Sequence, residues 1–308
     1  MTSYTRRDLG RLAFGVLPAL RLLGPSALLA AGQAKPDSKV KGVQIAMNVP
    51  YNFGGRNMEA GLLLKNCVDL GVSALELRTQ PVESYMGAPA ALVDAKAGDA
   101  SAAAELSKWR LSAPMDKARA FRKMYNDAGV AINIVKVDGI FAYPDAALDY
   151  AFTLAKTLGA RAISTEIAED GPERLGKFAD KYKMMVGYHG HEATGPEAWE
   201  KLFAYAAHNG ANLDIGHFVS GNHGSPIPFL TKHHQRVTHV HVKDRKTNKG
   251  PNVPFGQGDT PIVEVLKLIR DNKWNIDATI EFEYPVPAGS DRMTEIKKCV
   301  EFCRAALA

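Results

Sequence analysis

The stretch Asn212-Leu213-Asp214-Ile215-Gly216-His217-Phe218 sets a carboxylate and an imidazole three residues apart within a short apolar run. Such a run predicts a buried strand, which here would give way to a loop around Asp214 and His217. Two side chains with this spacing can face one cavity, where they share a divalent metal or divide metal and substrate between them. They could equally do no more than cap the next helix. The residues at the ends of the neighbouring predicted strands distinguish between these roles.

The other predicted strands carry similar groups near their ends. His239 and His241 lie in one of them, which Lys243 follows directly, and Glu281 lies in the next, which Glu283 follows directly. The upstream strands add Glu76, Glu166, His189, His191 and Glu192. A hydrophobic core does not need so many ionisable groups, and buried carboxylates repel one another unless a cation or protons compensate them. A divalent metal is the economical explanation, and mixed carboxylate and imidazole ligands suit Mn, Zn, Co, Fe or Mg.

Several of these residues also have an ordinary structural explanation. Glu76 and Glu283 could pair with a nearby Arg or Lys, and His239 could be a hydrogen-bonded core histidine. His191 or Glu192 could cap the helix that begins near Pro196.

Short apolar runs alternate with amphipathic segments along the whole chain after Lys41. The pattern predicts strands at 42–49, 74–78, 131–137, 162–167, 185–192, 212–218, 236–242 and 278–282, with helices at 58–70, 116–128, 145–158, 172–183, 196–209, 261–272 and 290–307. Eight strand–helix units imply parallel strands with right-handed crossovers, and eight is the number that closes a barrel. The fold class is therefore α/β, a (β/α)8 TIM barrel, with an Ala-rich, partly helical insertion near 88–106. An open doubly wound sheet is less suitable, because residues 52–55 are too irregular for a dinucleotide-binding fingerprint.

Residues 1–34 have the composition of an export signal rather than of a domain. Adjacent Arg6 and Arg7 precede an only moderately hydrophobic segment, as in a twin-arginine signal peptide. Arg21 and Gly24-Pro25 interrupt the apolar run, so we expect no stable membrane anchor. The alternative is a basic amphipathic helix that packs on the domain. We predict export to the periplasm and a single barrel domain over residues 35–308.

Composition and charge narrow the choice of partners. The chain has 308 residues, 46% of them hydrophobic and 23% charged, which is ordinary for a globular protein. Its formal charge of +5 falls to +2 once the +3 of residues 1–34 is removed, too little for a nucleic-acid-binding surface. Three cysteines, Cys67, Cys299 and Cys303, form neither a zinc ribbon nor a disulfide framework, and we expect buried thiols.

The ordered set of motifs resembles the sugar phosphate isomerase/epimerase-like family of the xylose isomerase-like TIM barrels. The matching motifs are the Asp-x-x-His that begins at Asp214, the His-x-Lys-Asp that begins at His241, Glu281 on the last strand, and the turn at 254–259 before the penultimate helix. The superfamily also contains ketose 3-epimerases, inosose dehydratases and endonuclease IV. The resemblance covers most of residues 40–307 and implies a xylose isomerase-like barrel that binds a divalent metal.

By this resemblance Asp214, His241 and Glu281 are metal ligands, and His217 contacts the substrate. The family's glutamate on strand five has no counterpart here, because that strand offers Tyr188-His189-Gly190-His191-Glu192. Either His189 or Glu166 supplies the fourth ligand. Glu166 is preferred, because a lone carboxylate in an otherwise apolar and small run needs a partner.

The leading functional hypothesis is a metal-dependent enzyme that removes a proton next to the carbonyl of a sugar or keto-sugar. Glu166, His189 or Glu283 would act as the base, Lys243 would stabilise the enediolate oxygen, and Glu76, His191 and His217 would bind the substrate. The product would arise by epimerisation, isomerisation or elimination. The alternatives are a metal-dependent phosphodiesterase of the endonuclease IV type and a non-catalytic periplasmic sugar-binding barrel. A small carbohydrate is the expected partner, and the sequence is compatible with a homo-oligomer.

Overall fold

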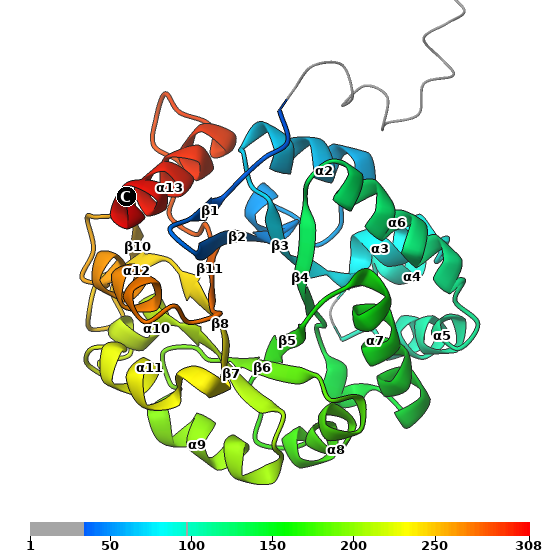
Figure 1. The fold of residues 1–308 in the computed structure, drawn as a ribbon. Helices are drawn as coiled ribbons and strands as arrows, with labels where there is room; N and C mark the ends of the chain where they lie inside the picture. Colours follow the sequence, from blue (N-terminus) through cyan, green and yellow to red (C-terminus); the bar gives the residue numbers. More distant parts are fainter. Residues whose placement is uncertain (1–33, 97) are drawn as a thin grey trace, which may run out of the picture. The chain divides into compact units, whose positions relative to one another are not determined.

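The computed structural model describes residues 34–96 and 98–308. Within these residues, eight parallel strands close into a barrel surrounded by helices (Figure 1). The barrel strands are β2 (Val43–Val49), β3 (Ala74–Arg78), β4 (Ala131–Lys136), β5 (Ala162–Glu166), β6 (Met185–His189), β7 (Asn209–Asp214), β8 (Val237–Val242) and β11 (Asp277–Ile280). Closure comes from β2, which pairs in parallel with both β3 and β11. The predicted (β/α)8 barrel is confirmed.

The helices and the minor strands complete the chain. The helices are α2 (Ala60–Asp69), α3 (Thr79–Met86), α4 (Ala90–Val93), α5 (Ala100–Arg110), α6 (Met115–Asp127), α7 (Asp145–Leu158), α8 (Pro172–Tyr182), α9 (Pro196–Tyr205), α10 (Ile215–Ser220), α11 (Ile227–His233), α12 (Ile262–Asp271) and α13 (Arg292–Leu307). Short 3-10 helices are η2 (Tyr51–Phe53), η3 (Ile140–Ala142) and η4 (His234–Arg236). Strand β1 (Lys39–Val40) pairs antiparallel with β2, and β9 (Asp244–Arg245) pairs antiparallel with β10 (Asn252–Val253).

The predicted elements form where residue pattern and burial agree. Every residue of β7, β8 and β11 is buried, as expected for parallel strands that are covered on both faces. Helix α7 has the predicted bounds, with an acidic first turn and Gly159 at its C-terminus in the left-handed region at φ +85°. Strand β3 also has the predicted bounds. The three cysteines are buried free thiols, as predicted.

Several predicted strands end one or two residues too late, and two end later still. Strand β6 ends at His189 rather than Glu192, and β7 ends at Asp214, so Gly216, His217 and Phe218 belong to α10. The cause in the second case is the Asp214 side chain, whose Oδ1 accepts a hydrogen bond from the backbone N–H of His217 at 2.8 Å and caps α10. Helix α9 stops at Tyr205, because β7 already begins at Asn209. Helices α3 and α11 were not predicted.

The Ala-rich segment at 88–106 contains α4 and most of α5, as its predicted helical portion required. Ala88, Val93 and Leu106 form a small apolar cluster there, with Leu92 and Trp109 packed against it. This segment therefore has a small core of its own beside the barrel.

The predicted signal segment lies, except for Ala34, outside the described residues. Among the described helices, none is both long and apolar enough to cross a membrane.

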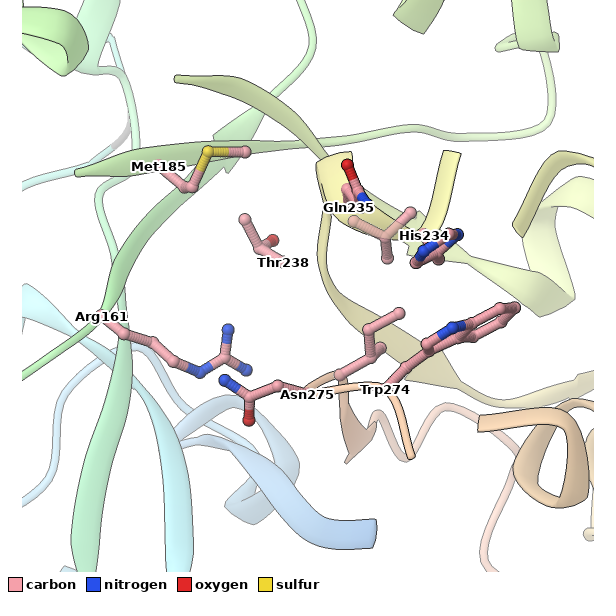
Figure 2. Close-up of a pocket in the computed structure, with 9 residues that line it drawn as sticks. Arg161, Met185, His234, Gln235, Thr238, Trp274 and Asn275 are labelled. Atoms are coloured by element: carbon pink, nitrogen blue, oxygen red, sulfur yellow. The ribbon is translucent and has the colours of Figure 1, made fainter. Parts of the chain in front are cut away.

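The two ends of the barrel differ in chemistry. A cavity of about 440 Å³, whose lining is drawn in Figure 2, lies at the amino-terminal ends of the strands. The Arg161 guanidinium at its wall lies 3.2 Å from the Asp277 carboxylate. Met185 and Thr238 of β6 and β8 also line this cavity. The clustered histidines and carboxylates lie at the opposite, carboxyl end of the strands, where TIM barrels carry their active sites.

Candidate metal centre

Four buried side chains meet at the carboxyl end of the barrel. His189 ends β6, Asp214 ends β7, His241 lies near the end of β8, and Glu281 follows β11 directly. One ligand atom from each lies within 4.8 Å of those of the other three. Strand register brings two of them together, because Asp214 and His241 are direct partners across β7 and β8. Two imidazoles and two carboxylates form a donor set that suits a first-row divalent metal.

The spacing within this group is that of donors around a common centre. His189 Nε2 lies 3.2 Å from Asp214 Oδ2, and His241 Nδ1 lies 3.2 Å from Glu281 Oε2. His241 Nδ1 is also 3.7 Å from Asp214 Oδ2. We call His189, Asp214, His241 and Glu281 the four-ligand group.

Lys243 extends into the same place. Its Nζ lies 3.0 Å from Asp214 Oδ2, 2.5 Å from Glu281 Oε2 and 2.8 Å from Glu283 Oε2. Burial lowers the pKa of Lys243, but these three carboxylates raise it more, so that its pKa lies well above the usual value. The positive charge of one ammonium group therefore compensates three carboxylates.

The group fits a divalent cation on two observations. Burial raises the pKa of Asp214 and of Glu281, but neighbouring cations, Lys243 first for Asp214 and His241 first for Glu281, hold both pKa values well below the usual range. Both carboxylates are therefore ionised. In addition, His241 Nδ1 and Glu281 Oε2 are buried and have no partner with hydrogen-bond geometry. Buried polar atoms without a partner call for a missing ion or water.

Glu76 lies beneath the four-ligand group. It is fully buried, and its Oε2 lies 2.5 Å from His241 Nε2 and 3.4 Å from His239 Nε2. Burial raises the pKa of Glu76, but His241 and His239 lower it more, and the carboxyl group is ionised. A carboxylate behind a ligating histidine fixes the orientation of the ring. Glu76, predicted to bind the substrate, contacts the far nitrogen of His241 in the structure.

Glu166 lies beside the four-ligand group rather than within it. Its Oε1 accepts a hydrogen bond from Lys136 Nζ at 2.5 Å, and its Oε2 lies 3.0 Å from His189 Nδ1 and 2.8 Å from His191 Nε2. Burial raises the pKa of Glu166, but these partners lower it far more, to well below its usual range. Of the two alternatives for the fourth ligand, His189 is therefore the residue grouped with Asp214, His241 and Glu281. Glu166 holds His189 from behind.

Glu283 faces an open space next to the centre. Its Oε1 accepts a hydrogen bond from the Tyr51 hydroxyl at 2.7 Å, and its Oε2 accepts one from Asn252 Nδ2 at 3.3 Å. A cavity of about 570 Å³ adjoins it, lined also by Tyr51, Arg56, Asn252 and Arg292. Glu283 is thus a carboxylate that a ligand can reach.

His217 is held by a residue that the sequence did not single out. Its Nδ1 accepts a hydrogen bond from Arg245 Nη1 at 2.7 Å, and Arg245 also donates to the carboxylate of Glu192. Burial is the main cause that lowers the pKa of His217. The ring of His217 lies 4.8 Å from that of His191 and 5.9 Å from that of His189, so all three histidines line one side of the centre.

Several residues at the site were missed from the sequence. Lys136 and Arg245 left a signal: Lys136 is a single charge in an apolar strand, and Arg245 directly follows the His-x-Lys-Asp motif. Asn48, whose Nδ2 donates to Glu281 Oε1 at 2.8 Å, and Tyr51 left none. Their contacts arise only because the barrel closes the first strand against the last.

Two of the sequence motifs prove to be one structural unit. The Asp244 carboxylate accepts hydrogen bonds from the backbone N–H groups of Gly256 at 2.8 Å, Gly258 at 2.9 Å and Thr260 at 3.2 Å. Only glycine fits at position 258, because a Cβ there would lie 1.9 Å from Asp244 Oδ1. The last residue of the His-x-Lys-Asp motif thus fixes the turn at 254–259, while His241 and Lys243 face the centre.

Comparisons with known proteins agree with this geometry. Residues 166–306 match the family model described as xylose isomerase-like TIM barrel. Among curated relatives, inosose dehydratase of Clostridium botulinum (strain Eklund 17B / Type B) is 34% identical over 120 residues, which cover 37% of this chain and 38% of that enzyme. The match therefore spans well under half of the relative's length.

Solved structures match over most of the chain. A D-psicose 3-epimerase of Clostridium cellulolyticum H10, determined with D-tagatose, superposes with a TM-score of 0.59 at 12% identity and covers 86% of this chain and 99% of its own. A xylose isomerase-like TIM barrel protein of Mycobacterium smegmatis, determined in complex with magnesium, gives 0.58 at 14% identity over 86% and 98%. At such identities these matches establish the fold. The resemblance to the xylose isomerase-like barrels is confirmed.

We predict that Asp244→Ala destabilises the barrel without removing any donor of the four-ligand group. Three backbone N–H groups lose their acceptor, and each such loss costs about 1–3 kcal/mol where the donor stays buried. Urea unfolding followed by circular dichroism measures the change. Asp259→Ala is the matched control, because the Asp259 carboxylate in the same turn is exposed and bonds to Lys246 and Thr247. Equal stability of the two variants would contradict the role of Asp244.

Proposed function

We propose that this protein, which has the xylose isomerase-like TIM barrel fold, is a divalent-metal-dependent enzyme that removes the proton next to the carbonyl of a keto-sugar or keto-polyol. The observation that carries the proposal is the four-ligand group, with the Lys243 ammonium beside it and the Glu283 carboxylate facing a cavity. The partial match to inosose dehydratase favours elimination of water as the overall reaction. Epimerisation and isomerisation are the alternatives.

In this proposal His189, Asp214, His241 and Glu281 hold the metal. A divalent ion in that position polarises a carbonyl and lowers the barrier to removing the neighbouring proton. Glu76 fixes His241 and Glu166 fixes His189 from behind, so both rings keep their orientation when the substrate binds.

The proton would go to Glu283. Its carboxylate borders the cavity, whereas the hydrogen bonds from His189 and His191 and the charge of Lys136 lower the pKa of Glu166 and make it a weak base. Lys243 Nζ, 2.8 Å from Glu283 Oε2, places a positive charge where the enolate oxygen develops. In the elimination, the C–H proton passes to Glu283, the C–H electron pair forms the new double bond, and the hydroxyl leaves as water with a proton from His191. His191 is exposed, and its hydrogen bond to Glu166 raises its pKa.

A hydrolase that uses more than one metal is the second candidate. Besides the group of Glu76 with His239 and His241, two further groups of potential ligands lie nearby: Glu166 with His189 and His191, which shares His189 with the four-ligand group, and His191 with Glu192 and His217. Both already have a protein cation, since Lys136 pairs with Glu166 and Arg245 pairs with Glu192. This compensation favours one metal ion, and metal stoichiometry separates the two candidates.

The proposed location is the periplasm. It rests on the twin-arginine pattern at Arg6 and Arg7. We expect cell fractionation to find the chain in the periplasm, and Arg6→Lys with Arg7→Lys to retain it inside the cell. Export that survives the double substitution would exclude this route.

We predict close to one divalent metal ion per chain, measured by elemental analysis after purification and dialysis. His189→Ala and Asp214→Ala remove a donor and lower metal affinity by at least the ~10–100-fold that loss of a supporting residue already costs. Glu166→Gln is the matched control, because it lies outside the four-ligand group and loses less. Loss of metal in Glu166→Gln with full retention in His189→Ala would reverse the ligand assignment. Two or three ions per chain would favour the hydrolase.

We predict that the metal-loaded enzyme exchanges or removes a proton next to the carbonyl of a keto-sugar or keto-inositol. In heavy water, NMR detects either deuterium uptake or the unsaturated product. Loss of a general base lowers rates by about 10²–10⁴-fold, and we expect this for Glu283→Gln with its metal content unchanged. Glu166→Gln is expected to lower the rate less. Undiminished exchange by Glu283→Gln would assign the base elsewhere, and no exchange with any keto compound would count against the enzyme.

A further inference from the structure

A large cavity that the proposed chemistry does not use lies next to the cavity at Glu283, with which it shares Arg56. Its volume is about 860 Å³, within the range of small-molecule sites. Its walls come from the start of α3, the Ala-rich helices α4 and α5, and the segment after β4. The apolar lining includes Leu92, Val93, Ala103, Leu106, Ala142 and Pro144.

The buried polar groups in this cavity are few, whereas the exposed part of its lining also carries charged residues such as Lys96. Glu83 and Arg110 form a buried bidentate pair, with Arg110 Nε 2.7 Å from Glu83 Oε1 and Nη2 3.1 Å from Oε2. Their charges cancel, and the Arg110 guanidinium also lies 4.4 Å from the centre of the Tyr143 ring. Gln80 differs from them. It is 8% exposed, and its Oε1 is buried without a hydrogen-bond partner among the described residues.

These features define the chemistry of the occupant. In the buried part of the cavity, apolar walls and a neutralised ion pair disfavour a charged or strongly hydrated group, because its polar atoms would lose water without finding partners. The unpaired Oε1 of Gln80 requires one hydroxyl or N–H donor from the ligand. The cavity therefore suits an apolar group that carries a hydroxyl.

The cavity continues toward the proposed base. Arg56 lines both this cavity and the neighbouring one of about 570 Å³ that is bordered by Tyr51 and Glu283. Asp138, another wall residue, pairs with Arg56 at 3.6 Å and with Arg78. The Arg78 guanidinium in turn lies 5.1 Å from the centre of the Tyr51 ring. A molecule with its sugar at Glu283 can thus extend along Arg56 into the apolar space.

We propose that the substrate is a keto-glycoside whose sugar lies at the metal centre and whose apolar, hydroxyl-bearing aglycone fills this second cavity. The inference rests on the proposed function for the sugar end. A free monosaccharide would leave the apolar walls and Gln80 Oε1 without a partner. The sugar would thus be selected by the metal centre and the glycoside by the cavity formed with α4 and α5.

Binding of paired ligands to the full chain tests this inference. Isothermal titration compares methyl, naphthyl and hydroxynaphthyl glycosides of one keto-sugar with the metal-loaded protein. We expect the naphthyl glycoside to bind at least about 10-fold more tightly than the methyl glycoside, because even one methylene in an apolar pocket changes discrimination by 10–200-fold. The hydroxyl of the third ligand should add further affinity through Gln80. Equal affinities for methyl and naphthyl glycosides would overturn the proposal.

Two variants locate the effect. Ala103→Trp fills the cavity from an exposed position on α5 and should abolish the preference for naphthyl, whereas Gln80→Leu should remove only the gain from the naphthyl hydroxyl. Ala207→Trp, at an exposed site after α9, is the matched control and should keep both preferences. Thermal unfolding confirms that each variant is folded. A naphthyl preference that survives Ala103→Trp would place the aglycone elsewhere.

Proton exchange and aglycone preference are separate measurements, so this inference and the proposed function can fail independently. Proton exchange with small keto-sugars but no aglycone preference would sustain the function and overturn the cavity proposal. Aglycone preference without proton exchange on any ligand would overturn the function and leave an apolar ligand site.

Discussion

The structure of the site depends on how its buried negative charge is compensated. Asp214 and Glu281 are ionised, and with Glu283 they surround the single ammonium of Lys243. Taking an ion out of water costs several kcal/mol even after relaxation, so such a cluster persists only with cations and hydrogen bonds around it. The pKa values of Asp214 and Glu281 are lowered, so the cluster relies on neighbouring cations rather than on protonation of these two carboxyl groups. Carboxylates gathered around unpaired buried ligand atoms are the kind of site that a dication can occupy.

The surrounding residues confine that negative charge to one place. Lys136 neutralises Glu166 on one side, and Arg245 neutralises Glu192 on another. Each pair also holds a histidine of the centre, since Glu166 contacts His189 and Arg245 donates to His217. Charge balance and ring orientation thus depend on the same contacts. A substitution in either pair would disturb both, and this coupling is expected where residues form one hydrogen-bond network.

The sequence was sufficient for the fold because the barrel follows from local patterns. Strand β3 and helix α7 matched their predicted bounds, and the donors Asp214, His241 and Glu281 could be placed because parallel strands end at one face. The choice between His189 and Glu166 could not be made in the same way. It depends on Lys136, one strand further, which draws Glu166 outward. The end of β7 was missed because Asp214 both caps α10 and faces the centre, and a residue pattern does not distinguish these uses.

In the two proposals, the metal centre carries the chemistry and the large cavity carries the substrate selectivity. This division follows from the residues that form each site. The four-ligand group is built from strand ends, whose positions the closed barrel fixes, so under the proposed function it would act on any keto-sugar that fits beside Lys243 and Glu283. The large cavity is bounded instead by α3, α4 and α5, with a small core of its own at Val93 and Leu106. Loops and added helices vary without disturbing a barrel. A change of substrate in such a protein would therefore require change in the helices near Gln80, while the ligands of the metal centre stay as they are.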